Sequence, residues 1–198
     1  MRDNRSVITD AEREELLRRS QVTPRRHGRP DVVYHYSEDG SIKRFAPHLA
    51  PSNPRHPPAV WALDADHAPL YWFPRHCPRI SVWANGAEQR TRLSELFHTE
   101  ATRICAVETS WLDAIRTAHI YEYHFDGELF APWAEADGQY ISGEVVHPIR
   151  VEMYDDLLAL HASHDVELRF TPRLGTLMDA MLASQLPFSF VRIRDARR

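Results

Sequence analysis

The sequence predicts one α+β domain with a mixed, mostly antiparallel sheet core and short helices. Segments rich in β-branched and aromatic residues are short, and they outnumber the segments with helical periodicity. The two kinds of segment do not alternate at the spacing of βαβ units, which disfavours a doubly wound parallel sheet. Hydrophobic residues make up 43% and charged residues 26% of the 198 residues, which is ordinary usage for a chain long enough to bury a core.

The individual elements follow from side-chain type and periodicity. Residues 32–36, Val-Val-Tyr-His-Tyr, predict a first strand, and Asp39-Gly40 predicts the turn after it. Leucine and methionine at helical spacing over 174–182 predict the clearest helix. The expected strands are 32–36, 60–63, 80–83, 103–107, 120–125, 140–146, 149–154 and 166–170. The expected helices are 65–72, 110–118, 154–161 and 174–182.

The N-terminal residues 1–30 are expected to form an arm and linker that is mobile in part. A short helix through Arg19 would have only Leu16 and Leu17 on its apolar face. Residues 23–30 are basic and interrupted by Pro and Gly, which is typical of a linker. A single α+β domain is therefore expected over 31–198.

Charge and cysteine content argue against several classes of protein. The formal net charge of −4 gives no reason to expect a nucleic-acid-binding surface. No apolar run approaches the ~18 residues of a membrane span, and the N-terminus lacks the apolar segment of a secretory signal. Cys77 and Cys105 are too few for a disulfide framework. These features predict a cytoplasmic protein with no membrane partner.

No strong catalytic motif is present: the sequence has no glycine-rich phosphate loop, CxxC pair, HExxH or GxSxG. The predicted first strand carries a weaker signal. Its alternation places His35 and Ser37 on one face and Tyr34 and Tyr36 on the other. His35 is suited to bind a ribose or a carbonyl by hydrogen bonds. A core histidine whose ring bonds to backbone is the alternative.

Aromatic and cationic residues follow the predicted second strand. Trp61 and Tyr71 offer planar surfaces near a strand-to-helix junction, where ligands often bind, although core packing would also explain them. Arg75 and Arg79 are bracketed by prolines, and their guanidinium groups suit a phosphate or a carboxylate. Surface salt bridges are the alternative. Cys77 is a candidate nucleophile only if a distant histidine approaches it in the fold.

Glu144 enters a predicted apolar strand, where a carboxylate is costly to bury. It therefore points either into a cleft or into solvent from an edge strand. A metal site is not expected, although His161 and His164 are three residues apart. His161 belongs to the apolar face of its predicted helix, and His164 suits the negative end of the helix dipole.

Three short motifs resemble an uncharacterised bacterial domain family. They are His-Tyr-Ser-Glu-Asp at 35–39, Val-Trp-Ala-Leu-Asp at 60–64, and Leu-Tyr-Trp-Phe-Pro-Arg at 70–75 followed by Cys-Pro-Arg at 77–79. The likeness covers roughly residues 31–195. It implies a domain but no activity.

The chain also resembles, more distantly, the NAD-dependent ADP-ribosyltransferases of the His–Tyr–Glu type. These enzymes have an aromatic-flanked His on the first strand, a stacking aromatic on a second strand, and a late Glu that binds the nicotinamide ribose. His35, Trp61 or Tyr71, and Glu144 occur here in that order. The sequence departs from the pattern at Trp61, where a Tyr is usual, and near Glu144, which lacks the Gln-x-Glu or Glu-x-Glu form.

This resemblance implies an ADP-ribosyltransferase-like fold that binds NAD as a substrate, or a related nucleotide, and transfers ADP-ribose to an unknown acceptor. Glu144 and His35 would be the catalytic residues, with Glu144 stabilising an oxocarbenium-like centre as nicotinamide leaves. The residues implied to bind the nucleotide are His35, Ser37, Trp61, Tyr71, Arg75 and Arg79. The alternative is a non-catalytic module that binds a small molecule or a protein in the same aromatic cleft.

Overall fold

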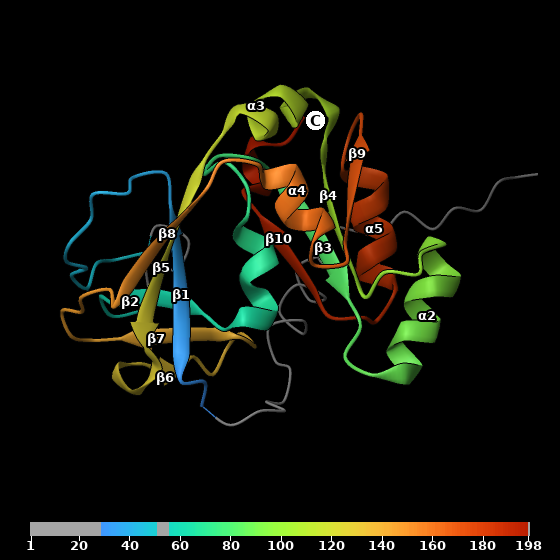
Figure 1. Cartoon of the computed structure of the whole chain (residues 1–198). Helices are drawn as coiled ribbons and strands as arrows, with labels where there is room; N and C mark the ends of the chain where they lie inside the picture. Colours follow the sequence, from blue (N-terminus) through green and yellow to red (C-terminus); the bar gives the residue numbers. More distant parts are fainter. Residues whose placement is uncertain (1–28, 51–55, 198) are drawn as a thin grey trace, which may run out of the picture.

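The computed structural model describes residues 29–50 and 56–197. The N-terminal arm predicted for residues 1–30 lies almost entirely outside the described residues. Figure 1 shows two sheets with helices between them and on one outer side. The α+β class with mostly antiparallel strands and short helices is confirmed.

The larger sheet has six strands in the order β6-β7-β2-β1-β5-β8, and each neighbouring pair is antiparallel. Its central strands β1 and β2 share one registered pair, Tyr34 with Leu63, whereas β1 pairs with β5 along its whole length. The two halves of the sheet are therefore joined by a short seam. The strands are β1 (Val32–Ser37), β2 (Val60–Leu63), β5 (Ile120–Asp126), β6 (Ala131–Pro132), β7 (Gln139–Ser142) and β8 (Arg150–Tyr154).

The smaller sheet has four strands in the order β10-β3-β4-β9, with β4 and β9 parallel and the other pairs antiparallel. Two helices, α2 (Ala87–Phe97) and α5 (Gly175–Ala183), cover its outer face. Their apolar side chains pack on Ile80, Val82 and Ile104 of the sheet. The strands are β3 (Arg79–Trp83), β4 (Arg103–Glu108), β9 (Val166–Thr171) and β10 (Phe188–Val191).

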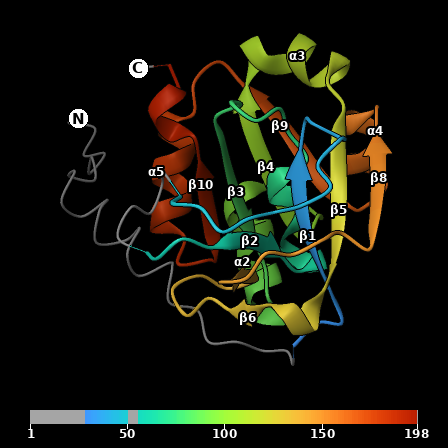
Figure 2. The ribbon, with the colours of Figure 1, turned by 90° about the vertical axis from the view of Figure 1, so that its left-hand side faces the viewer.

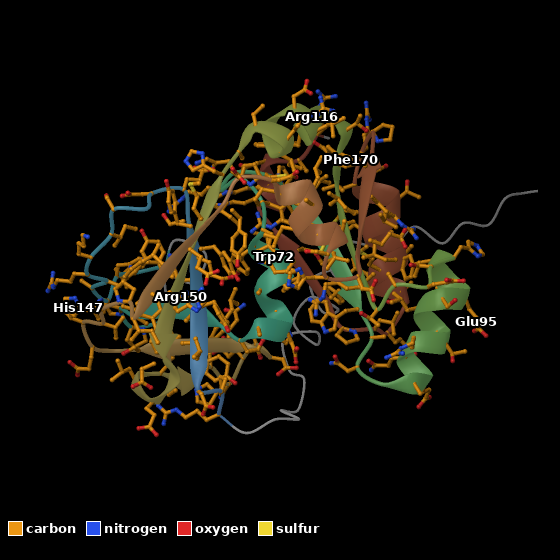
Figure 3. All side chains as sticks on the ribbon, viewed as in Figure 1. Trp72, Glu95, Arg116, His147, Arg150 and Phe170 are labelled. Atoms are coloured by element: carbon orange, nitrogen blue, oxygen red, sulfur yellow. The ribbon has the colours of Figure 1, made fainter. Side chains whose placement is uncertain are left out.

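A central layer lies between the two sheets. It contains the 3-10 helix η1 (Ala65–Tyr71), the residues that follow it, and helix α4 (Leu157–Ala162). Trp72 is labelled in this layer in Figure 3, and it is 4% exposed. The same cluster contains Val107 of the small sheet and Ile120 of the large sheet, so the central layer joins the two sheets into one core.

The outer face of the large sheet is covered by the segment that follows β1, which crosses in front of the strands in Figure 2. Phe45 of this segment packs edge-on against Tyr123 and Phe125, with ring centroids 5.0 Å apart in both cases. A backbone bridge between Phe45 and Val146 fixes the segment in place. This face of the sheet is therefore a second core, separate from the central layer.

Some of the predicted elements need correction. The strand predicted for 140–146 ends at Ser142, because Gly143 and Glu144 bend away from the sheet. Tyr154 belongs to β8 and not to the following helix, which Asp156 caps at its N-terminus. The helix predicted for 110–118 divides into a 3-10 turn, η2 (Thr109–Trp111), and a short α3 (Leu112–Thr117).

Candidate functional site

His35 lies on β1 beside the seam between β1 and β2. Its Nδ1 is 2.8 Å from the carbonyl oxygen of Trp61, and its ring packs edge-on against Phe45 at 5.1 Å. Burial lowers the pKa of His35 more than the hydrogen bond to Trp61 raises it, and the charge of the nearby Arg75 lowers it further. His35 is therefore neutral at pH 7, with a Nδ1–H that donates to Trp61. It ties the first strand to the second.

Trp61 lies on β2 and is half-buried. Its indole ring packs edge-on against Trp133 at 4.8 Å and His56 at 5.2 Å. Its Nε1–H is buried and has no hydrogen-bond acceptor among the described residues. Trp61 therefore combines an aromatic surface with an unpaired donor, as a ligand-binding residue would.

Glu144 lies just beyond β7 and is exposed. Ser142, the last residue of β7, pairs with Val60 of β2, and its Oγ accepts a hydrogen bond from the Glu144 backbone N–H at 3.3 Å. The Phe45–Val146 bridge places the segment after β7 beside the residue that packs on His35. The chain thus brings the segments that carry His35, Trp61 and Glu144 together in the large sheet, with Glu144 at its rim. Trp61 lies on the face opposite His35, because its neighbours Val60 and Ala62 belong to the core beside Phe45.

The other predicted ligand residues are dispersed. Ser37 ends β1, and its Oγ accepts from the Asp39 N–H at 3.1 Å. Arg75 is exposed, and its backbone N–H donates to the Glu38 carboxylate at 3.0 Å. Its side chain stays near enough to His35 to lower that pKa. Of the two arginines near the second strand, Arg75 is therefore the one placed beside His35.

Arg79 is a buried residue of β3 whose guanidinium serves the fold. Its Nε donates to the Leu70 carbonyl at 2.6 Å and its Nη1 to the Cys77 carbonyl at 3.0 Å. The group also lies over the rings of Tyr71 and Phe73, 5.2 and 5.3 Å from their centroids. This position does not suit a phosphate contact. Tyr71 already packs against this guanidinium, which leaves Trp61 as the better candidate for stacking on a base.

A cavity of about 400 Å³ opens beside β2 and β7. It lies between the β6–β7 region of the large sheet and the β3–α2 connection of the small one. Its wall carries both arginine and aspartate side chains. The lining residues include Asp64, Asp66, His67, Trp83, Asn85, Arg90, Thr102, Arg103, Asp137, Gln139 and Tyr140.

Three polar atoms in this wall are buried without hydrogen-bond partners among the described residues. They are Nε2 of His67, Nε1 of Trp83 and Nη1 of Arg103. The Arg103 guanidinium also lies over the Trp83 ring, 5.0 Å from its centroid, and its Nη2 donates to the Asp66 carbonyl at 2.5 Å. Buried polar atoms are rarely left unpaired, so the wall is suited to a polar ligand that offers acceptor oxygens to Trp83 and Arg103.

His67 is held by Asp64, the residue that begins η1. Asp64 Oδ1 accepts the His67 backbone N–H at 2.9 Å and lies 2.7 Å from His67 Nδ1. Gly138 packs directly against the His67 ring. A Cβ at position 138 would lie 1.9 Å from His67 Nδ1, so only glycine leaves room for the imidazole. With Nδ1 engaged by the carboxylate, the unpaired Nε2 remains for a ligand.

The sequence indicated part of this wall. Asp64 caps η1 through its side chain, at the strand-to-helix junction that the sequence predicted. Trp83, Arg103 and Gln139 were missed, because they lie on strands far apart in the chain and no local pattern links them. The candidate nucleophile Cys77 is fully buried, and burial raises its pKa to about 12, which keeps the thiol protonated.

Comparisons with known proteins identify a family but no activity. Residues 34–196 match the model of a family of unknown function, DUF6886. No curated protein and no solved structure matches the chain significantly. Among the described residues, no helix has both the length and the apolar character needed to cross a membrane.

Proposed function

We propose that this chain, which belongs to the DUF6886 family of unknown function, is an ADP-ribosyltransferase-like domain that binds NAD or a related nucleotide. One observation carries the proposal. The strands that hold the three motifs of the resemblance, β1 with His35, β2 with Trp61 and β7 before Glu144, are consecutive neighbours in one sheet. More than 100 residues separate the outer two in sequence, so this adjacency is a property of the fold.

The cavity beside β2 and β7 supports nucleotide binding. Arg90 and Arg103 line it, and forked guanidinium groups suit the oxygens of a diphosphate. The unpaired Nε1–H of Trp83 suits a further phosphate oxygen, and the unpaired Nε2 of His67 suits a ribose hydroxyl. Its volume of about 400 Å³ accommodates a large part of a nucleotide, with the remainder extending along β2 towards Trp61.

In the proposed reaction, Trp61 stacks on a planar base and His35 hydrogen-bonds a ribose hydroxyl. The bond between the ribose C1′ and the nicotinamide nitrogen breaks, and nicotinamide leaves with the bonding electrons. The Glu144 carboxylate stabilises the positive charge that develops on the ribose. An acceptor nucleophile or water then bonds to C1′ and releases its proton to solvent. Glu144 is at the rim and exposed, so its segment has to close over the ribose for this role.

Nucleotide binding is tested by Arg103→Ala. We expect wild-type protein to bind NAD and the variant to bind it at least tenfold more weakly, because a charged hydrogen bond contributes about 1.5–3 kcal/mol. Isothermal titration calorimetry measures both affinities. Arg116→Ala is the matched control, since Arg116 is exposed on α3 and pairs with the nearby Asp113 at 3.5 Å (Figure 3). Failure of the wild type to bind any nicotinamide or adenine nucleotide would refute the proposal.

Catalysis is tested separately by Glu144→Gln, with nicotinamide release as the readout. The substitution keeps the size of the side chain and removes its charge, so binding should persist while release slows by orders of magnitude. The exposed Glu95→Gln on α2 is the control and should leave the rate unchanged. Release as fast in Glu144→Gln as in the wild type would exclude the catalytic role of Glu144.

A non-catalytic binding module is the second candidate function, and the three buried unpaired polar atoms in the cavity favour it. Such atoms need a polar ligand but no reaction. This candidate predicts that NAD or a smaller anion binds in an Arg103-dependent manner while no nicotinamide is released. Thermal-shift measurements with phosphate, ADP-ribose and NAD, combined with the release assay, separate the two candidates.

A further inference from the structure

A polar cluster formed by Glu122, His124 and Glu152 lies on the inward face of the large sheet, away from the proposed nucleotide site. Glu122 and His124 are two residues apart on β5, so they point to the same side of the sheet. Glu152 of β8 is the registered cross-strand partner of Glu122. The side chains are 10%, 14% and 26% exposed in that order, which is unusual burial for two carboxylates.

The ligand atoms of these three side chains converge on one point. Each residue offers one atom, and the three atoms all lie within 4.8 Å of one another. His124 Nε2 is 2.9 Å from Glu122 Oε1 and 3.9 Å from Glu152 Oε1. Two carboxylate oxygens and one imidazole nitrogen are ligands that divalent cations accept.

The shortest of these contacts is not an aligned hydrogen bond. His124 Nε2 is buried, and it makes no hydrogen bond of acceptable geometry to any described residue, although Glu122 Oε1 is only 2.9 Å away. Two ligands bound to one metal at ~2.1 Å lie roughly 3 Å apart, with their lone pairs directed at the metal and not at each other. The arrangement of His124 and Glu122 matches that geometry.

The remaining carboxylate oxygens are held by tyrosine hydroxyls. Tyr36 OH donates to Glu122 Oε2 at 2.5 Å, and Tyr154 OH donates to Glu152 Oε2 at 3.1 Å. Tyr154 OH also lies 3.5 Å from Glu122 Oε1, so the two hydroxyls together fix the orientation of both carboxylates beside His124. Groups that orient ligands in this way are typical of the surroundings of metal ions in proteins.

We propose that Glu122, His124 and Glu152 bind a divalent transition-metal ion of the Zn²⁺ or Mn²⁺ type. The two carboxylates balance its charge, which makes their shared burial favourable. The third ligand, Glu152, also forms an ion pair with Arg150 through Oε1. Because the Arg150 side chain is 67% exposed, it can move into solvent when the ion binds. Arg150 is therefore a competitor for Glu152 Oε1.

Because Arg150 competes with the ion for Glu152, two variants should change the metal affinity in opposite directions. Metal-free full-length protein is titrated with Zn²⁺ and, separately, with Mn²⁺ by calorimetry. Glu152→Gln should weaken binding by at least tenfold, whereas Arg150→Ala should strengthen it severalfold, because it frees a ligand oxygen. The exposed Glu128→Gln is the control and should bind as the wild type does. Circular dichroism checks that each variant is folded.

Three outcomes would overturn the proposal. The first is a wild-type Kd weaker than about 1 mM for both ions. The second is binding that Glu152→Gln and His124→Gln, as folded proteins, both leave unchanged. The third is Arg150→Ala binding that is weaker than that of the wild type, since removing a cation that competes for Glu152 should raise the affinity for a metal ion.

Discussion

The buried imidazole of His161 makes the stability of the core depend on pH. Its Nδ1 lies 2.6 Å from the Leu157 carbonyl of the same helix, and its ring packs against Phe73 at 4.6 Å and Trp72 at 5.6 Å. Burial lowers the pKa of His161 to about 4. The imidazole is therefore neutral in the folded protein and serves as an aromatic spacer that also donates to the helix backbone.

Acid should destabilise the protein through this residue. The unfolded chain binds a proton at His161 near pH 6.5, whereas the folded protein binds it only near pH 4. Stability from this group is thus complete above pH 6.5 and falls as the pH drops towards 4, by up to ~3 kcal/mol. Urea unfolding at pH 7 and pH 4.5 measures the difference.

Two histidine variants separate the contribution of His161 to acid sensitivity from that of the other titrating groups. His161→Phe keeps an aromatic ring and removes the titrating group, so its stability should fall less than that of the wild type over the same pH interval. The exposed His76→Gln should retain the wild-type dependence. An equal loss of stability in the wild type and His161→Phe would show that other groups account for acid sensitivity.

In helix α5, apolar side chains at helical spacing form one buried face that stabilises the fold. Met181 and Leu182 are 0% and 1% exposed, and Met178 is 8% exposed, which confirms the buried face predicted from their spacing. We expect Leu182→Ala and Met178→Ala each to lower the free energy of unfolding by 2–5 kcal/mol, which is the typical cost of such truncations. The exposed Ala180→Ser should change it by less than about 1 kcal/mol. Denaturant unfolding that gave near-neutral values at both buried sites would contradict this packing.

Other elements were beyond prediction for identifiable reasons. Helix α2 has few buried apolar residues, chiefly Leu93 and Phe97, while Leu96 is 50% exposed, so its sequence lacks a continuous apolar face. Strand β10 is a short half-buried segment after Pro187. The β2 strand, in contrast, was predicted with its observed bounds, since four apolar residues precede a capping Asp64. Compact local patterns were predictable, and weakly amphipathic ones were not.

The candidate sites also differ in how far the sequence could predict them. His35, Trp61 and Glu144 were suggested by a resemblance that preserves their order along the chain. The metal-ligand cluster depends on the cross-strand register of Glu122 with Glu152, and the cavity depends on that of Ala62 with Tyr140. No periodicity in a single segment encodes a register between strands that are 30 or 80 residues apart. These groups therefore became visible only in the folded chain.

At the scale of the whole molecule, the two sheets share the central layer that contains η1 and α4. The apolar cluster in this layer includes residues of both sheets, and Trp72 is among its largest members. The cavity that we propose as the nucleotide site lies between the same two sheets, at the side where β7 approaches the β3–α2 connection. The relative position of the cavity walls thus depends on the packing of the central layer.

We therefore expect the two sheets to unfold as one cooperative unit, and Trp72→Ala tests this. Truncating a buried tryptophan costs about 3–5 kcal/mol, which should lower the Tm by roughly 10 °C in a chain of this size. Hydrogen exchange at the backbone amides of β4 and β5 should accelerate by the same factor, because both strands pack on the layer that Trp72 fills. The exposed Leu129→Ala should leave both rates unchanged. Faster exchange in one sheet alone would show that the sheets are independent units, and the cavity would then be free to open as they move apart.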